Sequence, residues 1–183
     1  MKCLVCKTVE LEEYELLPGL KVQKCPDCGG SWMDFQDYIE WHNNNNVQIE
    51  DNNGDKKYLP VDDSTNAKLC PHCKRILTVY KVSANLNFKV EHCAFCYGIW
   101  FDKNEWENLR ANNLHNKIGE FFTESWQKKI KEEERRQYFE DFYTRKFGEE
   151  DYAKIKEIRN WLDNNENKDM LLAYLMNKNP YKL

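Results

Sequence analysis

The eight cysteines of this 183-residue chain form four Cys-x-x-Cys pairs, and these pairs fall into two matching sets. The first set is Cys3/Cys6 with Cys25/Cys28, and the second set is Cys70/Cys73 with Cys93/Cys96. Two residues between the cysteines of a pair allow a tight turn to aim both sulfur atoms at one ion. Each set therefore has the spacing of a four-sulfur metal site, and the spacing occurs twice.

The similarity of the two sets extends beyond their cysteines. The second pair of each set is followed at the same distances by a glycine, a tryptophan and an aspartate, which are Gly30, Trp32 and Asp34 in the first copy and Gly98, Trp100 and Asp102 in the second. A shared period of about 67 residues indicates an internal duplication. The chain consists of two copies of one small module and a tail without cysteines.

Each cysteine module runs for only about 40 residues, a length at which apolar burial seldom outweighs chain entropy without a disulfide or a metal ion. The chain opens inside a motif at Met1-Lys2-Cys3, with no secretory signal pattern. Its longest apolar stretch, Met170 to Met176, is far shorter than the roughly 20 residues of a membrane span. We therefore expect a soluble, cytoplasmic protein with no membrane partner. In a reducing cytosol, paired Cys-x-x-Cys motifs are more often zinc ligands than disulfides.

Four sulfur ligands leave an ion no open position for water or substrate, which is typical of structural zinc. We expect two structural zinc ions per chain, each contributing on the order of 10 kcal/mol or more to folding. The expected ligands are Cys3, Cys6, Cys25 and Cys28 for one ion and Cys70, Cys73, Cys93 and Cys96 for the other. Iron in the same cage, as a rubredoxin-like redox centre, is the less favoured alternative. His72 and His92 lie beside ligand cysteines, but each set already has four sulfurs, so we interpret both as bystanders.

Between its two cysteine pairs, each copy has the pattern of a β-hairpin. The first hairpin is expected at Leu11–Leu17 and Leu20–Lys24 around Pro18-Gly19, and the second at Leu77–Val82 and Leu86–Val90 around Ala84-Asn85. A hairpin with a metal site at its base is a zinc ribbon. The sequence thus predicts an α+β fold class of small zinc-stabilised modules: two tandem ribbons, each with a short helix, followed by a helical region.

The short helices are predicted just after the second cysteine pair of each copy. Asp34 and Asp102 have the pattern of N-caps, and Asp37 and Glu105 complete capping boxes three positions later. The tryptophans before them are expected in the core rather than as exposed base-stacking platforms, because a module this small needs its large aromatic side chains inside.

The run Cys25-Pro-Asp-Cys28-Gly29-Gly30-x-Trp32-x-Asp34 resembles the signature of the transcription-factor-IIB-type zinc-finger family, which is common in uncharacterised bacterial proteins. The second copy resembles the same signature, with Tyr97 in the place of Gly29, and that departure predicts a less regular knuckle. The resemblance implies zinc ribbons over about residues 1–41 and 68–113. The family name reports the similarity of the ribbon to that of a transcription initiation factor and does not by itself assign a role in transcription.

These patterns divide the chain into residues 1–45 and 68–113 as ribbons, 46–67 as a polar linker, and 114–183 as a helical C-terminal region. Because the linker is long and rich in turn formers, we expect it to be flexible. The two ribbons would then act independently or clamp one partner. A substitution of Cys28 or Cys96 would unfold one ribbon and spare the other.

In the helical region, apolar side chains recur at helical spacing. They predict a continuous helix from about Gly119 to Phe147, another from Glu149 with a stripe that ends at Leu162, and a short one over Asp169 to Met176.

The charge of the ribbons bears on nucleic-acid binding. Residues 1–41 hold four basic and eight acidic residues, residues 70–109 hold five and four, and the whole chain has a formal net charge of −4. Because binding to nucleic acid depends on cations that meet phosphates, ribbon 1 is a poor candidate. Only ribbon 2 keeps enough positive charge, from Lys74, Arg75, Lys81 and Lys89.

The sequence has no glycine-rich phosphate loop, nucleophile elbow or HExxH motif, so we expect no enzyme. The leading hypothesis is a non-catalytic zinc-binding adaptor or regulatory module that contacts protein partners through ribbon edges and the helical tail. One alternative is a nucleic-acid-binding transcription regulator that acts through ribbon 2. The other is a thiol-redox or zinc sensor, in which a Cys-x-x-Cys pair releases zinc on oxidation.

Overall fold

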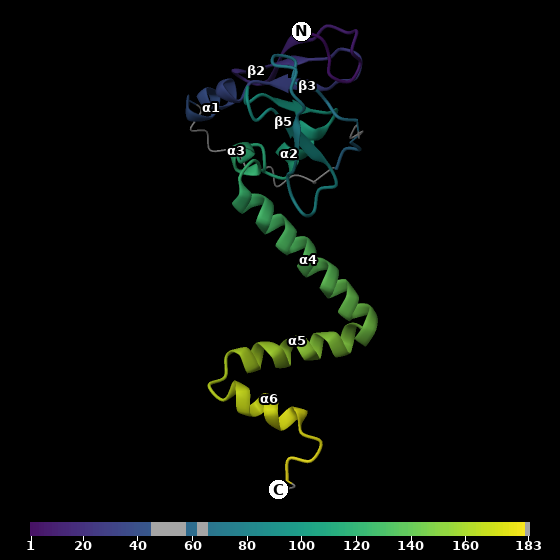
Figure 1. Cartoon of the computed structure of the whole chain (residues 1–183), viewed down its shortest axis with the longest axis vertical. Coiled ribbons are helices and arrows are strands. Elements are labelled where there is room, and N and C mark those ends of the chain that lie inside the picture. The colour runs from purple at the N-terminus through teal and green to yellow at the C-terminus, as the bar shows by residue number, and fades with distance from the viewer. Residues whose placement is uncertain (45–57, 62–65, 182–183) are drawn as a thin grey trace. The chain divides into compact units, whose positions relative to one another are not determined.

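The structure of the protein is a computed structural model that describes residues 1–44, 58–61 and 66–181 (Figure 1). The chain forms two compact units, Met1–Glu132 and Glu133–Leu183, which we call the ribbon unit and the helical unit. Most of the predicted linker, 46–67, lies outside the described residues.

Each repeat of the ribbon unit contains a β-hairpin, a third strand and a helix. In the first repeat these are β1 (Glu12–Leu17), β2 (Leu20–Lys24), β3 (Ser31–Met33) and α1 (Phe35–Asn44). In the second they are β4 (Thr78–Lys81), β5 (Lys89–His92), β6 (Ile99–Phe101) and α2 (Glu105–Ala111). The predicted α+β class and both ribbons are confirmed. The three-residue strands β3 and β6 were not predicted, because three residues are too few to show an alternating pattern.

The two repeats join into a single six-stranded sheet with the strand order β1-β2-β3-β6-β5-β4. The junction is the antiparallel pair of β3 and β6, in which Trp32 lies opposite Trp100 and Met33 opposite Ile99. Trp32 and Trp100 are equivalent residues, and Met33 pairs with the residue equivalent to Ser31, so an approximate two-fold axis relates the repeats at this pair. The sequence left open whether the two ribbons act independently, and the structure joins them in one sheet.

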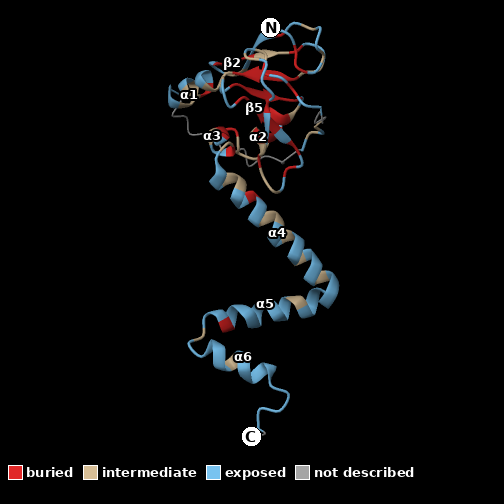
Figure 2. Ribbon diagram, viewed as in Figure 1, coloured by how far each residue is buried: buried red, intermediate tan, exposed pale blue. Residues whose placement is uncertain are grey.

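The two faces of this sheet bury different side chains, because successive residues of a strand point to opposite faces. Met33, Ile99 and Phe101 belong to an apolar core with Tyr38 of α1 and Leu109 of α2. The cysteines pack in a second cluster with Trp32 and Trp100. Both tryptophans are at most 1% exposed, which confirms that they are core residues. Figure 2 shows the buried residues concentrated on the strands.

The tryptophans of the junction each pack against a glycine of the other repeat. A Cβ atom added at Gly30 would lie 2.3 Å from Cζ2 of Trp100, and one added at Gly98 would lie 1.9 Å from Cζ2 of Trp32. Both distances are far below van der Waals contact. The two glycines therefore leave the space that the indole rings of the opposite repeat occupy.

The helix of the second repeat starts differently from the prediction. α1 begins directly after Asp34, as expected, but α2 begins after Asn104, which adopts φ 69°, and not after Asp102. Glu105 does accept a hydrogen bond from the Asp102 N–H (2.9 Å), so half of the predicted capping box forms. The Asp102 carboxylate is engaged elsewhere: it accepts from Trp100 Nε1 (2.7 Å) and from Lys68 Nζ (3.0 Å).

Lys68, Glu91 and Asp102 form a buried ionic cluster in which the Lys68 ammonium binds both carboxylates. Each of the three residues is at most 6% exposed. These hydrogen bonds and charges raise the pKa of Lys68 despite the opposing effect of burial. Removing one member of such a cluster would leave an uncompensated buried charge, so the segment before Cys70 is fixed to β5 and β6.

The expected continuous helix from Gly119 to Phe147 is two helices, α3 (Ile118–Phe121) and α4 (Glu124–Phe147). The break falls at Thr123, whose hydroxyl oxygen accepts a hydrogen bond from the Trp126 N–H (3.3 Å) and so begins α4. In the ribbon unit, Trp126 Nε1 donates to the Val82 carbonyl and Gln127 Nε2 to the Lys81 carbonyl. The first turns of α4 therefore pack on the second ribbon.

The helical unit contains the rest of α4, α5 (Glu149–Asp163) and α6 (Lys168–Met176), close to the predicted ranges. Gly148 separates α4 from α5 with φ 83°. Of the residues described in this unit, only Leu162 is buried. Figure 2 accordingly shows α5 and α6 as mainly exposed.

The contact between repeats predicts that Gly98→Ala destabilises the ribbon unit by about 1–3 kcal/mol, because the new methyl group must displace the Trp32 ring or the backbone. Chemical denaturation of the zinc-loaded protein measures this change. Gly119→Ala in α3 is the matched control, since its methyl group would lie 3.2 Å from only the ring edge of Phe35. Equal stability of Gly98→Ala and the wild type would contradict the proposed packing.

Candidate metal centres

The four Cys-x-x-Cys pairs form four knuckles of one backbone design. In each knuckle the residue after the second cysteine donates its N–H to the carbonyl oxygen of the first cysteine, over distances of 2.8–3.1 Å. That residue has a left-handed backbone in all four cases, at Lys7, Gly29, Lys74 and Tyr97. The tight turn that results brings the two sulfurs of a pair to the same side.

The knuckle that contains Tyr97 was expected to be less regular. Its geometry matches that of the Gly29 knuckle: φ is 59° at Tyr97 and 75° at Gly29, and the Cys93 and Cys25 N–H groups donate to Gly98 and Gly30. The prediction was therefore wrong about geometry. The departure from glycine costs backbone strain of about 1–2 kcal/mol instead, because the Cβ atom is unfavourable in this conformation.

The knuckles bring the predicted ligands together in two groups: Cys3, Cys6, Cys25 and Cys28, and Cys70, Cys73, Cys93 and Cys96. Within each group the sulfurs all lie within 4.8 Å of one another. Sγ–Sγ distances are 3.5 Å for Cys3 and Cys28, 3.9 Å for Cys6 and Cys25, and 3.6 Å for Cys73 and Cys93. All eight cysteines are free rather than disulfide-bonded.

These distances fit a single ion at the centre of each group. Four sulfurs placed tetrahedrally at a Zn–S distance of about 2.3 Å would be about 3.8 Å apart. Cys3 Sγ also accepts from the Val5 and Cys6 N–H groups, and Cys93 Sγ from the Cys96 N–H, at 3.3–3.4 Å. Such N–H donors favour thiolate ligands. The two groups suit two zinc ions.

Without a metal ion, four negatively charged thiolates close together are unfavourable. Burial raises the pKa of Cys28 and raises that of Cys96 to about 12, whereas the Arg75 N–H lowers the pKa of Cys73 to about 7. A bound dication would offset the repulsion between the thiolates, so metal binding and thiol deprotonation are linked.

The two histidines beside the ligands contribute to packing. His92 is buried on β5, where its ring stacks on Phe122 with a centroid distance of 4.0 Å, and burial lowers its pKa to about 4. The ring of His72 lies 5.8 Å from that of Trp32. Neither histidine belongs to either group of potential ligand atoms in the described parts of the chain.

The comparison with protein families agrees with this geometry. The family model described as transcription factor zinc-finger matches residues 2–44 and 69–111. Both repeats match the same zinc-ribbon family. Each matched region contains one complete group of four cysteines, so the resemblance predicted from the sequence is confirmed.

Searches of curated proteins and of solved structures found no match. No helix in the described residues is long and apolar enough to cross a membrane.

The shared sheet predicts that Cys28→Ser destabilises both repeats, in contrast to the independent unfolding that the sequence suggested. The zinc content should fall from two ions per chain to one or fewer, and amide protons of β5 and β6 should lose protection together with those of β1–β3. Metal analysis and hydrogen exchange measure the two effects. Cys96→Ser should give the reciprocal result. Two separate unfolding transitions in either variant would contradict the coupling.

Proposed function

We propose that this protein is a non-catalytic, cytoplasmic adaptor in which two zinc ions, bound by the two groups of four cysteines, hold a rigid ribbon unit and the helical unit contacts a protein partner. The observation that carries this proposal is the exposure of α6. None of the nine residues of α6 is buried, although six of them are large and apolar. The exposed fractions reach 61% at Leu175, 73% at Met170 and 84% at Met176.

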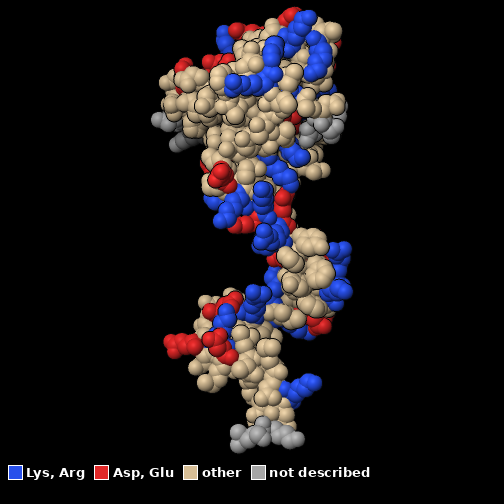
Figure 3. All heavy atoms as spheres, viewed as in Figure 1, with Lys and Arg blue, Asp and Glu red and all other residues tan. Residues whose placement is uncertain are grey.

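The composition of α6 supports a protein contact. Its only charged residues are Lys168 and Asp169 in the first turn, and Figure 3 shows little charge over this helix. An apolar helix face of this kind is used in helix-in-groove recognition, where side chains at helical spacing enter an apolar groove. Exposed apolar surface of this extent marks interaction sites in soluble proteins.

The ribbon unit supplies further support because its surface offers unpaired sheet edges. Among the described residues, β1 and β4 are the outer strands of the sheet, and each has one edge without a neighbouring strand. Tyr14 on β1 is 47% exposed and Val79 on β4 is 51% exposed. Exposed strand edges accept an additional strand from a partner. The closed sulfur coordination of both sites fits a structural rather than a catalytic role.

The adaptor role predicts that Leu175→Glu weakens binding of a heterologous protein partner at least about 10-fold, because it places a charge in the apolar contact. The partner is first isolated with tagged wild-type protein from the source cells and is then purified for titration calorimetry. Asn160→Glu on α5 is the matched control, since it adds the same charge outside α6. Equal binding by both variants, or the absence of any specific partner, would contradict the role.

A second function is favoured by one specific feature, a cleft of about 420 Å³ between the first knuckles of the two repeats. Three lysines line it: Lys2 and Lys7 come from ribbon 1 and Lys74 from ribbon 2. Figure 3 shows basic residues at this end of the ribbon unit. A nucleic-acid contact here would use both repeats, whereas the sequence pointed to ribbon 2 alone. Lys81 and Lys89 do not line this cleft. They pair with each other at the end of the β4–β5 hairpin that is farthest from the knuckles.

Binding of single-stranded DNA or RNA tests this second function through its salt dependence. If the cleft contacts phosphates, Lys7→Asn with Lys74→Asn should lower the affinity about 10-fold and flatten the salt dependence, because two cations are lost. Asparagine suits the left-handed backbone of both positions. Fluorescence anisotropy measures the affinity, with Lys81→Asn and Lys89→Asn as the control. Absence of any salt-sensitive binding removes this function. A thiol-redox or zinc-sensing role stays a prediction of the sequence.

A further inference from the structure

The apolar surface of α4 and α5 in the helical unit is separate from α6 and has its own geometry. On α4, the rings of Phe139, Tyr143 and Phe147 stack at intervals of one turn, with centroid distances of 6.0 and 5.7 Å. Tyr143 also lies 6.0 Å from Tyr152, the first aromatic residue of α5. The ladder therefore continues from one helix to the next.

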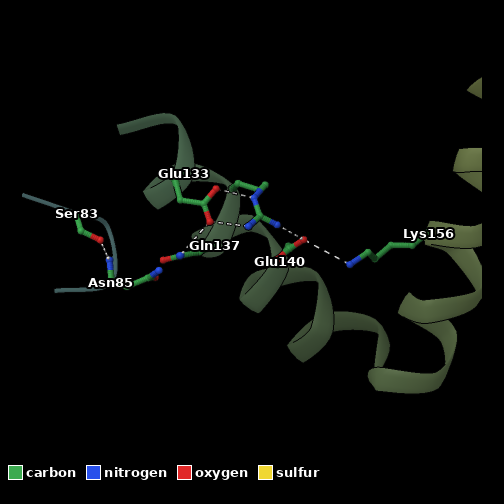
Figure 4. A network of polar contacts seen from close by, with 7 residues as sticks. Ser83, Asn85, Glu133, Gln137, Glu140 and Lys156 are labelled. Atoms are coloured by element: carbon green, nitrogen blue, oxygen red, sulfur yellow. Dashed lines mark hydrogen bonds and ion pairs between the residues drawn. The ribbon is translucent and has the colours of Figure 1, made fainter. Parts of the chain in front are cut away.

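Polar contacts connect the same two helices. Lys156 on α5 lies 3.4 Å from the Glu140 carboxylate on α4, and the Glu140 side chain also binds Arg136 at 3.0 Å (Figure 4). Exposed ion pairs of this kind contribute little to stability. They do not compensate for the small amount of buried apolar surface, since Leu162 is the one buried residue in the described part of this unit.

The exposed area of this surface approaches one side of a stable protein interface. Six large apolar side chains form the ladder and its continuation on α5, and each is 37–54% exposed: Phe139, Tyr143, Phe147, Ile155, Ile158 and Trp161. With about 200 Å² for a large side chain, they present about 550 Å². A specific interface buries about 800 Å² per partner. The patch lies at the upper end of the range for the largest apolar patch of a typical monomer, about 300–600 Å², and such patches are often functional.

The surface contains both a projecting side chain and a groove that can receive one. Trp161 is 54% exposed. At the corner of α4 and α5 lies a groove of about 540 Å³ that includes Phe147 and Ile155, with Lys146, Asp151 and Lys154 at the same site. A two-fold symmetric interface requires that a surface be complementary to itself, so a knob and a hole on one face meet that requirement.

We infer that the occupant of this surface is a second copy of the chain, docked through antiparallel packing of α5 on α5 about Ile158. This inference deepens the proposed function, because it names one partner of the helical unit. In this register Trp161 of each copy lies across from Ile155 of the other copy and next to its groove. The apolar stripe of α5 is buried at the centre.

The balanced charge of the helical unit favours a second copy over a partner of one charge sign. Residues 133–183 hold ten basic and eleven acidic residues, and on α5 the acidic ones lead the helix at Glu149, Glu150 and Asp151 while Lys154, Lys156 and Arg159 follow. Because the unit is nearly neutral, two copies meet with little net repulsion, whereas a strongly acidic or basic partner would meet like charges.

The mass of the purified, zinc-loaded full chain in solution tests the inference. Multi-angle light scattering between about 1 and 100 µM should show the mass rise from that of one chain, 22.0 kDa, to twice that value. Ile158→Glu should raise the dissociation constant at least about 100-fold, because it sets two carboxylates face to face at the symmetry axis. Asn160→Glu, on the opposite side of α5, should dimerise like the wild type.

A second variant tests the register without disturbing the fold. A thiol at the symmetry axis lies close to its own copy, so Ile158→Cys should be joined into dimers by a short bismaleimide, above the background of the wild type, and Asn160→Cys should not. A wild-type mass of one chain at 100 µM would overturn the inference. So would equal loss of the dimer in both glutamate variants, or equal cross-linking of both cysteine variants.

The outcome is independent of the adaptor experiment, because the two use different helices. A monomer that still binds its heterologous partner through α6 overturns only the self-association. A dimer for which Leu175→Glu has no effect on any partner overturns only the adaptor role.

Discussion

The antiparallel contact of β3 with β6 is the constraint on which the ribbon unit depends. Each repeat alone has about 40 residues and a three-residue inner strand, too little for a stable core. Pairing the inner strands buries Trp32 and Trp100 against the glycines of the opposite repeat and completes one apolar core between the sheet and its helices. The two metal centres then lie on one sheet, in a shared cluster with the two tryptophans. Folding of one centre is thereby coupled to that of the other.

The two repeats have also diverged at equivalent positions. Asp34 directly precedes α1, whereas Asp102 is drawn into the buried cluster with Lys68 and Glu91. The indole N–H of Trp100 donates to Asp102, while that of Trp32 has no hydrogen-bond acceptor in the described residues. The ionic cluster makes the second repeat the more polar side of the junction. It anchors the chain segment that enters that repeat.

Much of this arrangement follows from local sequence patterns. The cysteine spacing predicted both groups of four sulfurs, and the turn and alternation patterns predicted both hairpins, because these features involve residues close together in the chain. The helix that follows Asp34 was predicted by its cap for the same reason. The stripes of α5 and α6 appeared in the periodicity of Tyr152, Ile155 and the later apolar residues.

The errors concern contacts between distant residues. The pairing of β3 with β6 joins segments 68 residues apart at Trp32 and Trp100, and no local pattern reports it. One signal was available in the sequence, because Gly30 and Gly98 stand at equivalent positions, each two residues before a tryptophan. Both glycines are explained by the space that they leave for a tryptophan ring of the other repeat. The α2 start was mispredicted because Lys68, 34 residues away, competes for the Asp102 carboxylate. The break between α3 and α4 depends on Thr123. Its capping role was missed because the helical spacing of apolar residues predicted one continuous helix across this position.

The approximate two-fold axis inside the ribbon unit has a consequence for how such a protein evolves. A module that had to find an identical mate by diffusion would assemble only above a threshold abundance, and every substitution would appear on both sides of the axis at once. Placing both halves on one polypeptide keeps the mate at a fixed high local concentration. It also allows each half to change alone, so one side can acquire a buried lysine that its counterpart never had to accommodate.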